Sequence, residues 1–221
     1  MIGGQSVVKL RLFSNRYGEQ AHKKYIVGFP DGKFKPDRHI TRAEIAAIVV
    51  RILDKENQVV DKKNYPKDVS SKSWYANSVA IAWQLGLLGG YQDGTFKPDK
   101  PISRAELAAV ISKLVGVPET PMITAHFSDM SNHWANTVIE EMYRNGILGG
   151  YGDGTFKPNT YIKRSEAVTM INRLLYVGEL HGTSQSFPDV SNNHWAFKEV
   201  EEAAINHHYI RNDDGSEQYK K

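Results

Sequence analysis

The chain has 221 residues, of which 40% are hydrophobic and 24% charged, with a net charge of +3 at pH 7. These values are typical of a globular protein, and no stretch approaches the roughly 18 consecutive apolar residues of a membrane span. The absence of cysteine excludes disulfides and thiolate metal sites, and the small positive charge does not support nucleic-acid binding.

The N-terminal segment, taken as residues 1–20, reads as an extension to the folded part. Met1 to Val8 lack the basic flank and apolar run of a signal peptide, so we expect any export signal to lie outside this sequence. Residues 6–13 alternate enough to predict a short strand, and the rest of this segment and 212–221 are expected to be loosely ordered.

One Gly-rich segment then occurs three times, at 28–36, 90–98 and 150–158. Each copy contains an Asp-Gly pair, which is typical of a tight turn, and ends on proline. An Ile-x-Arg-x-Glu motif follows each copy and begins a predicted helix, the first of them at about 41–53. Repetition of this kind indicates a repeat architecture.

These predicted helices have recognisable starts. Thr41 with Glu44 and Ser103 with Glu106 form capping boxes, whereas the third copy has Lys163 at the cap and should begin least well. Behind the caps, apolar residues fall on one helical face. They are Ile45, Ile48, Val49 and Ile52; Leu107, Val110, Ile111 and Leu114; and Ala167, Met170, Ile171 and Leu174.

A second motif runs from an aspartate to a tryptophan and begins another helix. It occurs at 68–74, 129–134 and 189–195, and the last helix is predicted to extend to Tyr209. Gly86 and Gly146 stand where a helix needs a left-handed C-terminal residue.

The units are offset along the chain, which opens and closes with half a unit. Since a repeat that cannot bury its own apolar face needs its neighbours, we expect the two halves to pack together as a third unit. The predicted organisation is an extension at 1–20, a half-repeat at 21–53, repeats at 66–115 and 127–175, and a half-repeat at 187–211 that closes the bundle, all in one domain.

These motifs carry a family resemblance. Tyr-x-Asp-Gly-Thr-Phe-Lys-Pro before Ile-x-Arg-x-Glu, with Phe187-Pro-Asp-Val190 and His194-Trp-Ala196, resembles the S-layer homology (SLH) domain over most of the chain. The resemblance implies a mainly α fold, a pseudo-threefold bundle of helix-loop-helix repeats. It implies a non-catalytic module that anchors surface proteins by binding secondary cell-wall polysaccharide, typically a pyruvylated N-acetylmannosamine unit, in grooves between repeats. The expected location is the cell wall or S-layer of a Gram-positive-type bacterium.

The resemblance also implies the glycan contacts, which recur in every copy. They are Arg42, Arg104 and Arg164; Trp74, Trp134 and Trp195; and Gly28, Phe29, Gly90, Tyr91, Gly150 and Tyr151. Arginine suits a pyruvate carboxylate because its planar guanidinium donates two parallel hydrogen bonds. Free N–H groups at each helix start would add to the attraction, and glycine would let the backbone approach the sugar.

Simpler roles for these residues stay open. The tryptophans could be core, and the arginines could pair with acidic residues of the next repeat. Because the first copy has Phe29 and Lys33 and the third has Lys163, we expect one or two working grooves, with Arg42 and Arg104 favoured.

Other functions fit less well. The Asp-Gly loop lacks the oxygen ligands of a calcium loop, and His194, His207 and His208 are expected to be surface residues rather than a zinc site, so we predict no metal and no cofactor. No catalytic motif is present. The main alternative is a structural module that self-associates into a lattice, without glycan.

Overall fold

The computed structural model describes residues 19–61, 63, 65–116 and 126–220. The strand predicted at 6–13 lies outside these residues. Within the described part, no helix is long and apolar enough to cross a membrane.

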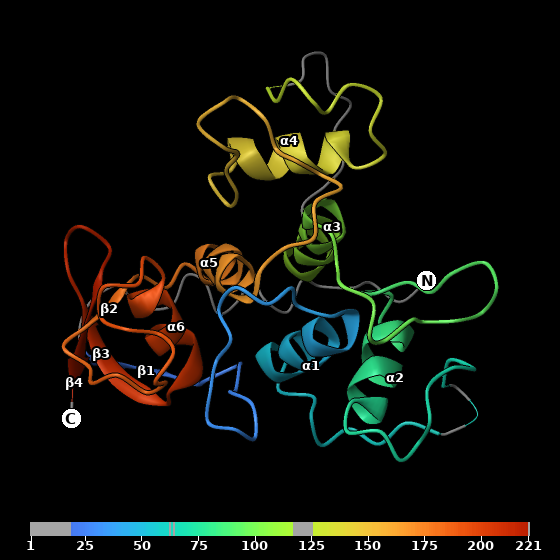
Figure 1. The fold of residues 1–221 in the computed structure, drawn as a ribbon, viewed down its shortest axis with the longest axis horizontal. Coiled ribbons are helices and arrows are strands. Elements are labelled where there is room, and N and C mark those ends of the chain that lie inside the picture. The colour runs from blue at the N-terminus through green and yellow to red at the C-terminus, as the bar shows by residue number, and fades with distance from the viewer. Residues whose placement is uncertain (1–18, 62, 64, 117–125, 221) are drawn as a thin grey trace.

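Six helices occur in the described residues, and they form three pairs. Three follow the Ile-x-Arg-x-Glu motifs: α1 (Arg42–Ile52), α3 (Arg104–Val115) and α5 (Arg164–Leu175). Each packs against one of the Asp…Trp helices, α2 (Ala76–Gln84), α4 (Asn136–Arg144) and α6 (Phe197–Ala204). Figure 1 shows α1, α3 and α5 gathered near the centre, with each partner helix farther out.

The predicted capping boxes of α1 and α3 are confirmed. The hydroxyls of Thr41 and Ser103 accept from the backbone N–H groups of Glu44 and Glu106. Lys163 cannot accept such a bond, and its ammonium instead binds Asp37 at 2.7 Å. The predicted apolar stripes are buried except at Ile52, and α1 is buried over Arg42–Val50, because it lies at the centre.

The segments before the three central helices form a closed cycle of backbone hydrogen bonds. Ile40 N–H donates to the carbonyl of Ile162 at 3.1 Å, Ile102 N–H to Ile40 at 3.0 Å, and Ile162 N–H to Ile102 at 3.1 Å. All three isoleucine side chains are fully buried. Residues far apart in the sequence are thereby fixed at one point.

The aspartate of each Asp…Trp motif holds one Gly-rich loop. Asp68 accepts from the N–H groups of Phe96 and Lys97, both at 2.7 Å, and Asp129 does the same in the next copy. Asp189, near the C-terminus, accepts from Phe34 at 2.9 Å and Lys35 at 2.7 Å. The third aspartate therefore reaches the loop at the opposite end of the chain.

A small sheet also joins the chain ends, and it was not predicted. Its strands are β1 (Glu19–His22), β2 (Leu180–His181), β3 (His207–Arg211) and β4 (Glu217–Lys220), in the order β1-β3-β4-β2. The expectation of loose structure is wrong for 19–20 and 217–220, which pair as strands. The helix predicted to reach Tyr209 ends at Ala204, because 207–210 alternates between buried and exposed residues, the pattern of a strand.

We predict that Asp189→Ala lowers the free energy of unfolding by about 2–4 kcal/mol, because two backbone N–H groups lose a charged acceptor. Urea denaturation followed by circular dichroism measures the change. The exposed Asp213→Ala is the control and should leave stability within about 0.5 kcal/mol of the parent. Equal stability of the two variants would contradict this role of Asp189.

Candidate functional site

The three motif arginines are buried, with exposed fractions of 5%, 7% and 3% for Arg42, Arg104 and Arg164. Each guanidinium reaches into the loop of the next repeat. Arg42 donates from Nε to the carbonyl of Phe96 at 2.9 Å and from a terminal nitrogen to that of Gly89.

The other two arginines repeat this arrangement. Arg104 donates to the carbonyls of Phe156 at 2.9 Å and Gly149 at 3.3 Å. Arg164 donates to those of Phe34 and Val27. Burial lowers the pKa of Arg164 to about 10, which still leaves it cationic at neutral pH.

Aromatic rings enclose each guanidinium. Arg104 lies 4.7 Å from the ring centre of Tyr151 and 4.8 Å from that of Phe156. Tyr91 and Phe96 enclose Arg42 in the same way, and Phe29 and Phe34 enclose Arg164. The loop aromatics therefore contact the arginines that hold their loops, in cation–π contacts.

The prediction of a free helix N-terminus is wrong. The N–H groups of Arg42 and Ala43 donate to the carbonyls of Lys100 and Pro98, and that of Glu44 donates to its cap. The first turns of α3 and α5 are bonded to loop carbonyls in the same way. An incoming anion would find these donors already occupied.

The capping glutamates provide the ion pairs that were considered as an alternative role for the arginines. Arg42 lies 3.7 Å from Glu106, and Arg164 lies 3.6 Å from Glu44. Each pair joins one central helix to the next. The arginines are thus structural links between repeats, whatever else they contact.

The tryptophans behave in the opposite way. Trp74, Trp134 and Trp195 are 67%, 66% and 61% exposed, so they are not core residues. Each precedes the first turn of an outer helix. Large exposed indoles at corresponding places are typical of a binding surface, because a ligand that covers them removes apolar surface from water.

The loop glycines have a packing role. A side-chain carbon at Gly90 would lie 2.6 Å from Trp83, and at Gly150 it would lie 2.2 Å from Phe127. Gly28 is closed by Phe187 in the same way. An aromatic ring therefore fills the space that the sequence analysis reserved for a sugar.

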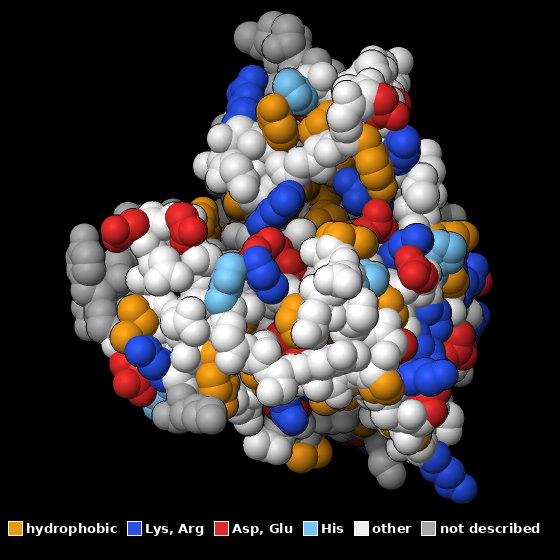
Figure 2. Space-filling model, turned by 60° about the vertical axis from the view of Figure 1, so that its left-hand side comes forward, with side chains coloured by type: hydrophobic (Ala, Val, Ile, Leu, Met, Phe, Trp, Pro, Cys, Tyr) orange, Lys and Arg blue, Asp and Glu red, His pale blue; other side chains and the backbone are white. Residues whose placement is uncertain are grey.

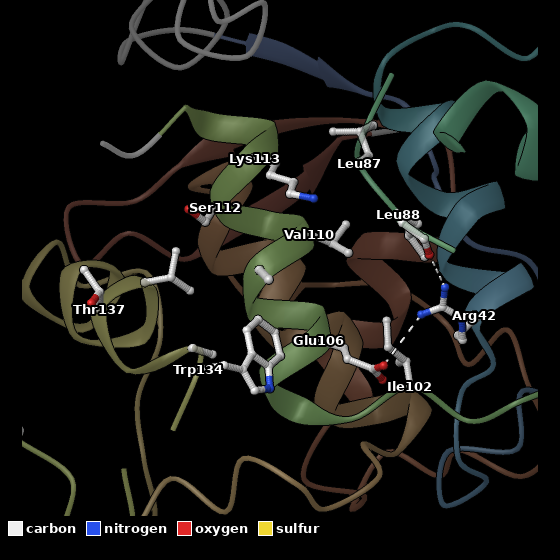
Figure 3. Close-up of a pocket in the computed structure, with 14 residues that line it drawn as sticks. Arg42, Leu87, Leu88, Ile102, Glu106, Val110, Ser112, Lys113, Trp134 and Thr137 are labelled. Atoms are coloured by element: carbon white, nitrogen blue, oxygen red, sulfur yellow. Dashed lines mark hydrogen bonds and ion pairs between the residues drawn. The ribbon is translucent and has the colours of Figure 1, made fainter. Parts of the chain in front are cut away.

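One groove of about 300 Å³ brings two of the predicted residues together. α3 forms its base, Trp134 and the start of α4 lie on one side, and Arg42 with Leu87–Gly89 lies on the other (Figure 3). Its volume is at the lower end of small-molecule sites. Gly90 and Tyr91 do not line it.

The groove combines both signs of charge with an apolar floor. Glu106 lies near the start of α3, and Lys113 lies toward its other end, where its ammonium binds the carbonyl of Gly86 at 2.8 Å. Val110 and Ile102 supply apolar surface between them. Figure 2 shows a comparable mixture, with Lys or Arg beside Asp or Glu around a hollow below the lobe that carries α4.

Sequence reasoning missed Lys113 as a groove residue, although a signal for it exists. Arg51 and Arg173 occupy the same register after their motif arginines, so a basic residue recurs on all three central helices. A cation that recurs beside each apolar stripe points to a shared position on the surface.

The fold and groove define a module of helical repeats with a groove that is lined by exposed Trp134, by Lys113 and by buried Arg42. The model of the S-layer homology domain matches residues 21–46, 67–108 and 126–168. The chain therefore belongs to the S-layer homology family.

Similar proteins carry surface and anchoring names. The chain is 41% identical over 207 residues to Cell surface glycoprotein 1 of Acetivibrio thermocellus, covering 87% of this chain and 9% of that protein. It is 38% identical over 206 residues to the Cellulosome-anchoring protein of the same organism, covering 90% and 46%. An Amylopullulanase of Thermoanaerobacterium thermosulfurigenes is 29% identical over 162 residues, covering 70% and 8%. The chain thus spans less than half of each of these relatives, one of which is named as an enzyme.

We predict that Arg104→Ala lowers the free energy of unfolding by about 3 kcal/mol, because two loop carbonyls lose a buried charged donor. Thermal and urea unfolding measure the effect. Arg144→Ala, which removes an exposed arginine from α4, is the matched control and should be nearly neutral. If Arg104→Ala were also neutral, the arginines would not hold the repeats together.

Proposed function

We propose that this chain is a non-catalytic module that anchors a surface protein by binding an acidic cell-wall polysaccharide between its repeats. The observation that carries the proposal is the groove in which exposed Trp134 stands opposite Arg42, with Lys113 farther along the same lining. Membership of a family whose relatives include a named anchoring protein supports it. The corresponding location is the cell wall or S-layer.

The groove residues have complementary tasks in this proposal. The Trp134 indole would pack against the C–H face of a sugar ring, a contact that aromatic side chains make well. Lys113 would attract a carboxylate such as that of a pyruvate ketal, while Arg42 would hold the loop that forms the far wall. Glu106 would accept sugar hydroxyls, because an ionised carboxylate is an acceptor only.

We infer two further grooves of the same kind. Arg104, Arg173 and Trp195 correspond to Arg42, Lys113 and Trp134, and so do Arg164, Arg51 and Trp74, by their places on the helices. The buried arginine contacts recur in both. Phe29 replaces the tyrosine that contacts the arginine in the other two copies, and Lys163 stands at the start of α5, so we expect the groove of Arg164 to bind most weakly.

The pseudo-threefold arrangement and the composite repeat belong to the same proposal. The cycle through Ile40, Ile102 and Ile162 supports the first. The hydrogen bonds from Phe34 and Lys35 to Asp189 support the second. The groove of Arg164 would then depend on both ends of the chain.

We predict that Trp134→Ala and Lys113→Gln each weaken binding to intact walls at least about tenfold. The melting temperature of each variant should equal that of the parent chain, because both side chains lie at the groove and not in the core. Co-sedimentation with Gram-positive cell walls measures this, using walls with their secondary polysaccharide, walls stripped of it and walls lacking pyruvyl groups. Val59→Ala and Lys24→Gln, at exposed positions outside the groove, are the matched controls.

Three results would separate the alternatives. Binding to intact walls only, lost in both groove variants, would support a lectin that recognises a carboxylate on the polysaccharide. Equal binding to walls without pyruvyl groups would remove the pyruvate from the proposal. Association of the protein with itself in the absence of any wall, unchanged by the groove variants, would favour lattice assembly.

A further inference from the structure

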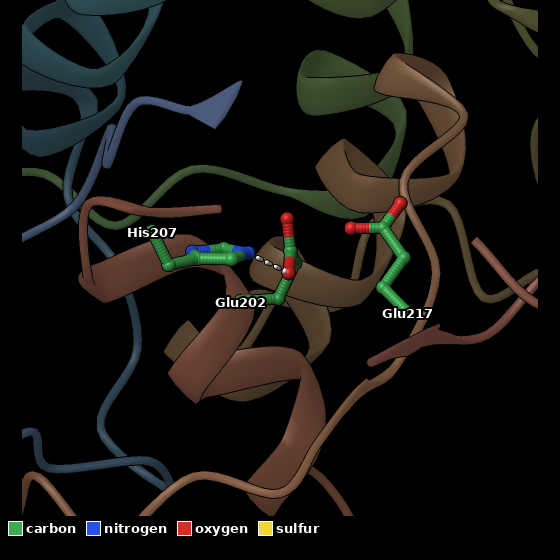
Figure 4. A group of neighbouring side chains, drawn as sticks. All are labelled: Glu202, His207 and Glu217. Carbon is green, nitrogen blue, oxygen red and sulfur yellow. Dashed lines mark ion pairs between the residues drawn. The ribbon is translucent and has the colours of Figure 1, made fainter. Parts of the chain in front are cut away.

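A second cluster of functional side chains lies at the sheet, away from the groove. Glu202 comes from α6, His207 from β3 and Glu217 from β4. One ligand atom of each lies within 4.8 Å of the others, and the three side chains are 0% exposed. Figure 4 shows the Glu202 carboxylate between the His207 ring and the Glu217 carboxylate. We expected His207 to be a surface residue, and this expectation is wrong.

The cluster has buried polar atoms that lack hydrogen bonds. Oε2 of Glu217 finds no hydrogen-bond partner among the described residues, and the oxygens of Glu202 face only the ring nitrogens of His207 and His22, each at 3.0 Å. Such groups are costly inside a protein and call for an explanation, one of which is an ion. His22 of β1 adds a further unsatisfied atom, its Nε2, on a side chain that is only 8% exposed.

The orientation of His207 is that of a metal ligand. Its Nδ1 lies 3.1 Å from the carbonyl of Ile205, to which an Nδ1–H can donate. In that neutral tautomer, the lone pair of Nε2 faces Oε2 of Glu202 at 3.0 Å. Two lone pairs in contact repel unless a cation or a proton lies between them. A backbone carbonyl that fixes one ring nitrogen while the other binds metal is the usual outer-shell pattern.

The two carboxylates are also held in place. Glu217 Oε1 accepts from Arg211 at 2.7 Å and from the Gly178 N–H at 3.1 Å, so its Oε2 is left for another partner. Oε1 of Glu202 lies 3.0 Å from Nδ1 of His22. The carboxylates of Glu202 and Glu217 lie close together inside the protein. A nearby divalent cation would remove the repulsion between the carboxylates.

We propose that Glu202, His207 and Glu217 form a binding site for a zinc ion, with His22 positioning Glu202. Imidazole with carboxylate oxygens suits zinc, whereas calcium and magnesium prefer oxygen ligands alone. The atoms of three ligands at roughly 2.0–2.2 Å from one zinc would lie about 3–4 Å apart, so small side-chain rotations would close the site. The ion would join α6, β3 and β4, and through His22 also β1, in the sheet where β1 pairs with β3.

The test uses the full chain, first stripped with a chelator and then titrated with Zn²⁺, Ca²⁺ or Mg²⁺ separately. We expect one tightly bound Zn²⁺ per chain by calorimetry and metal analysis. At a free zinc concentration 100 times Kd, the melting temperature should rise by about 5–10 °C. Calcium and magnesium should have no such effect.

Glu217→Gln and His207→Gln should both lose the bound zinc and the rise in melting temperature. Glu217→Gln keeps the shape and removes a buried charge, so without metal it should melt no lower than the parent. The control is His208→Gln, because His208 is the exposed neighbour of His207, paired with Glu19 at 2.7 Å. It should keep zinc binding unchanged.

Absence of stoichiometric zinc from the parent chain would overturn the proposal. So would zinc binding that survives in Glu217→Gln and His207→Gln, or that disappears in His208→Gln, since the ion would then be held by surface histidines. In those cases a proton shared within the cluster would account for the buried groups.

Discussion

The structure depends on one interaction, the buried arginine of each central helix bound to backbone carbonyls in the loop of the next repeat. A Gly-rich loop has few helix or strand partners for its carbonyls, and buried carbonyls need donors. A guanidinium offers several donors in a fixed plane and can satisfy two carbonyls at once. The loop carbonyls in turn occupy the free N–H groups of the helix that carries the arginine. Each repeat is therefore completed by its neighbour.

This mutual completion also explains where the groove lies. Arg42 binds the carbonyl of Gly89 and so holds Leu87–Gly89 near α1. Leu87–Gly89 form one side of the groove along α3, and Trp134 forms the other. The arginine builds the site, while the tryptophan and Lys113 are placed to meet a ligand. Loss of wall binding in an arginine variant would thus be ambiguous, because the fold and the site would fail together.

Local features were predictable from the sequence, because they depend on neighbours in the chain. The Thr41 and Ser103 caps and the left-handed Gly86 are of this kind. Partners at long range were not predictable: nothing near Arg104 identifies the carbonyl of Phe156 as its acceptor. The same limit hid the sheet, since β3 pairs with β1 from the opposite end of the chain.

Residue type alone was also a poor guide to which side chains are buried and which are exposed. An indole at the start of an amphipathic helix could be core or surface, and the three indoles are exposed because they precede the packed face. His207 and His208 are adjacent, yet strand alternation buries one and exposes the other. From the sequence Lys113 is an ordinary solvated lysine, and only the fold shows that it lines the same groove as Trp134.

The most direct test is two-dimensional NMR of the four indole N–H groups during titration with purified wall polysaccharide. We predict that the resonances of Trp134 and of at least one of Trp74 and Trp195 shift and saturate, while that of Trp83, which packs against the core, does not shift. Shifts confined to residues outside the grooves, or none at saturating polysaccharide, would contradict the claim that this surface binds the wall.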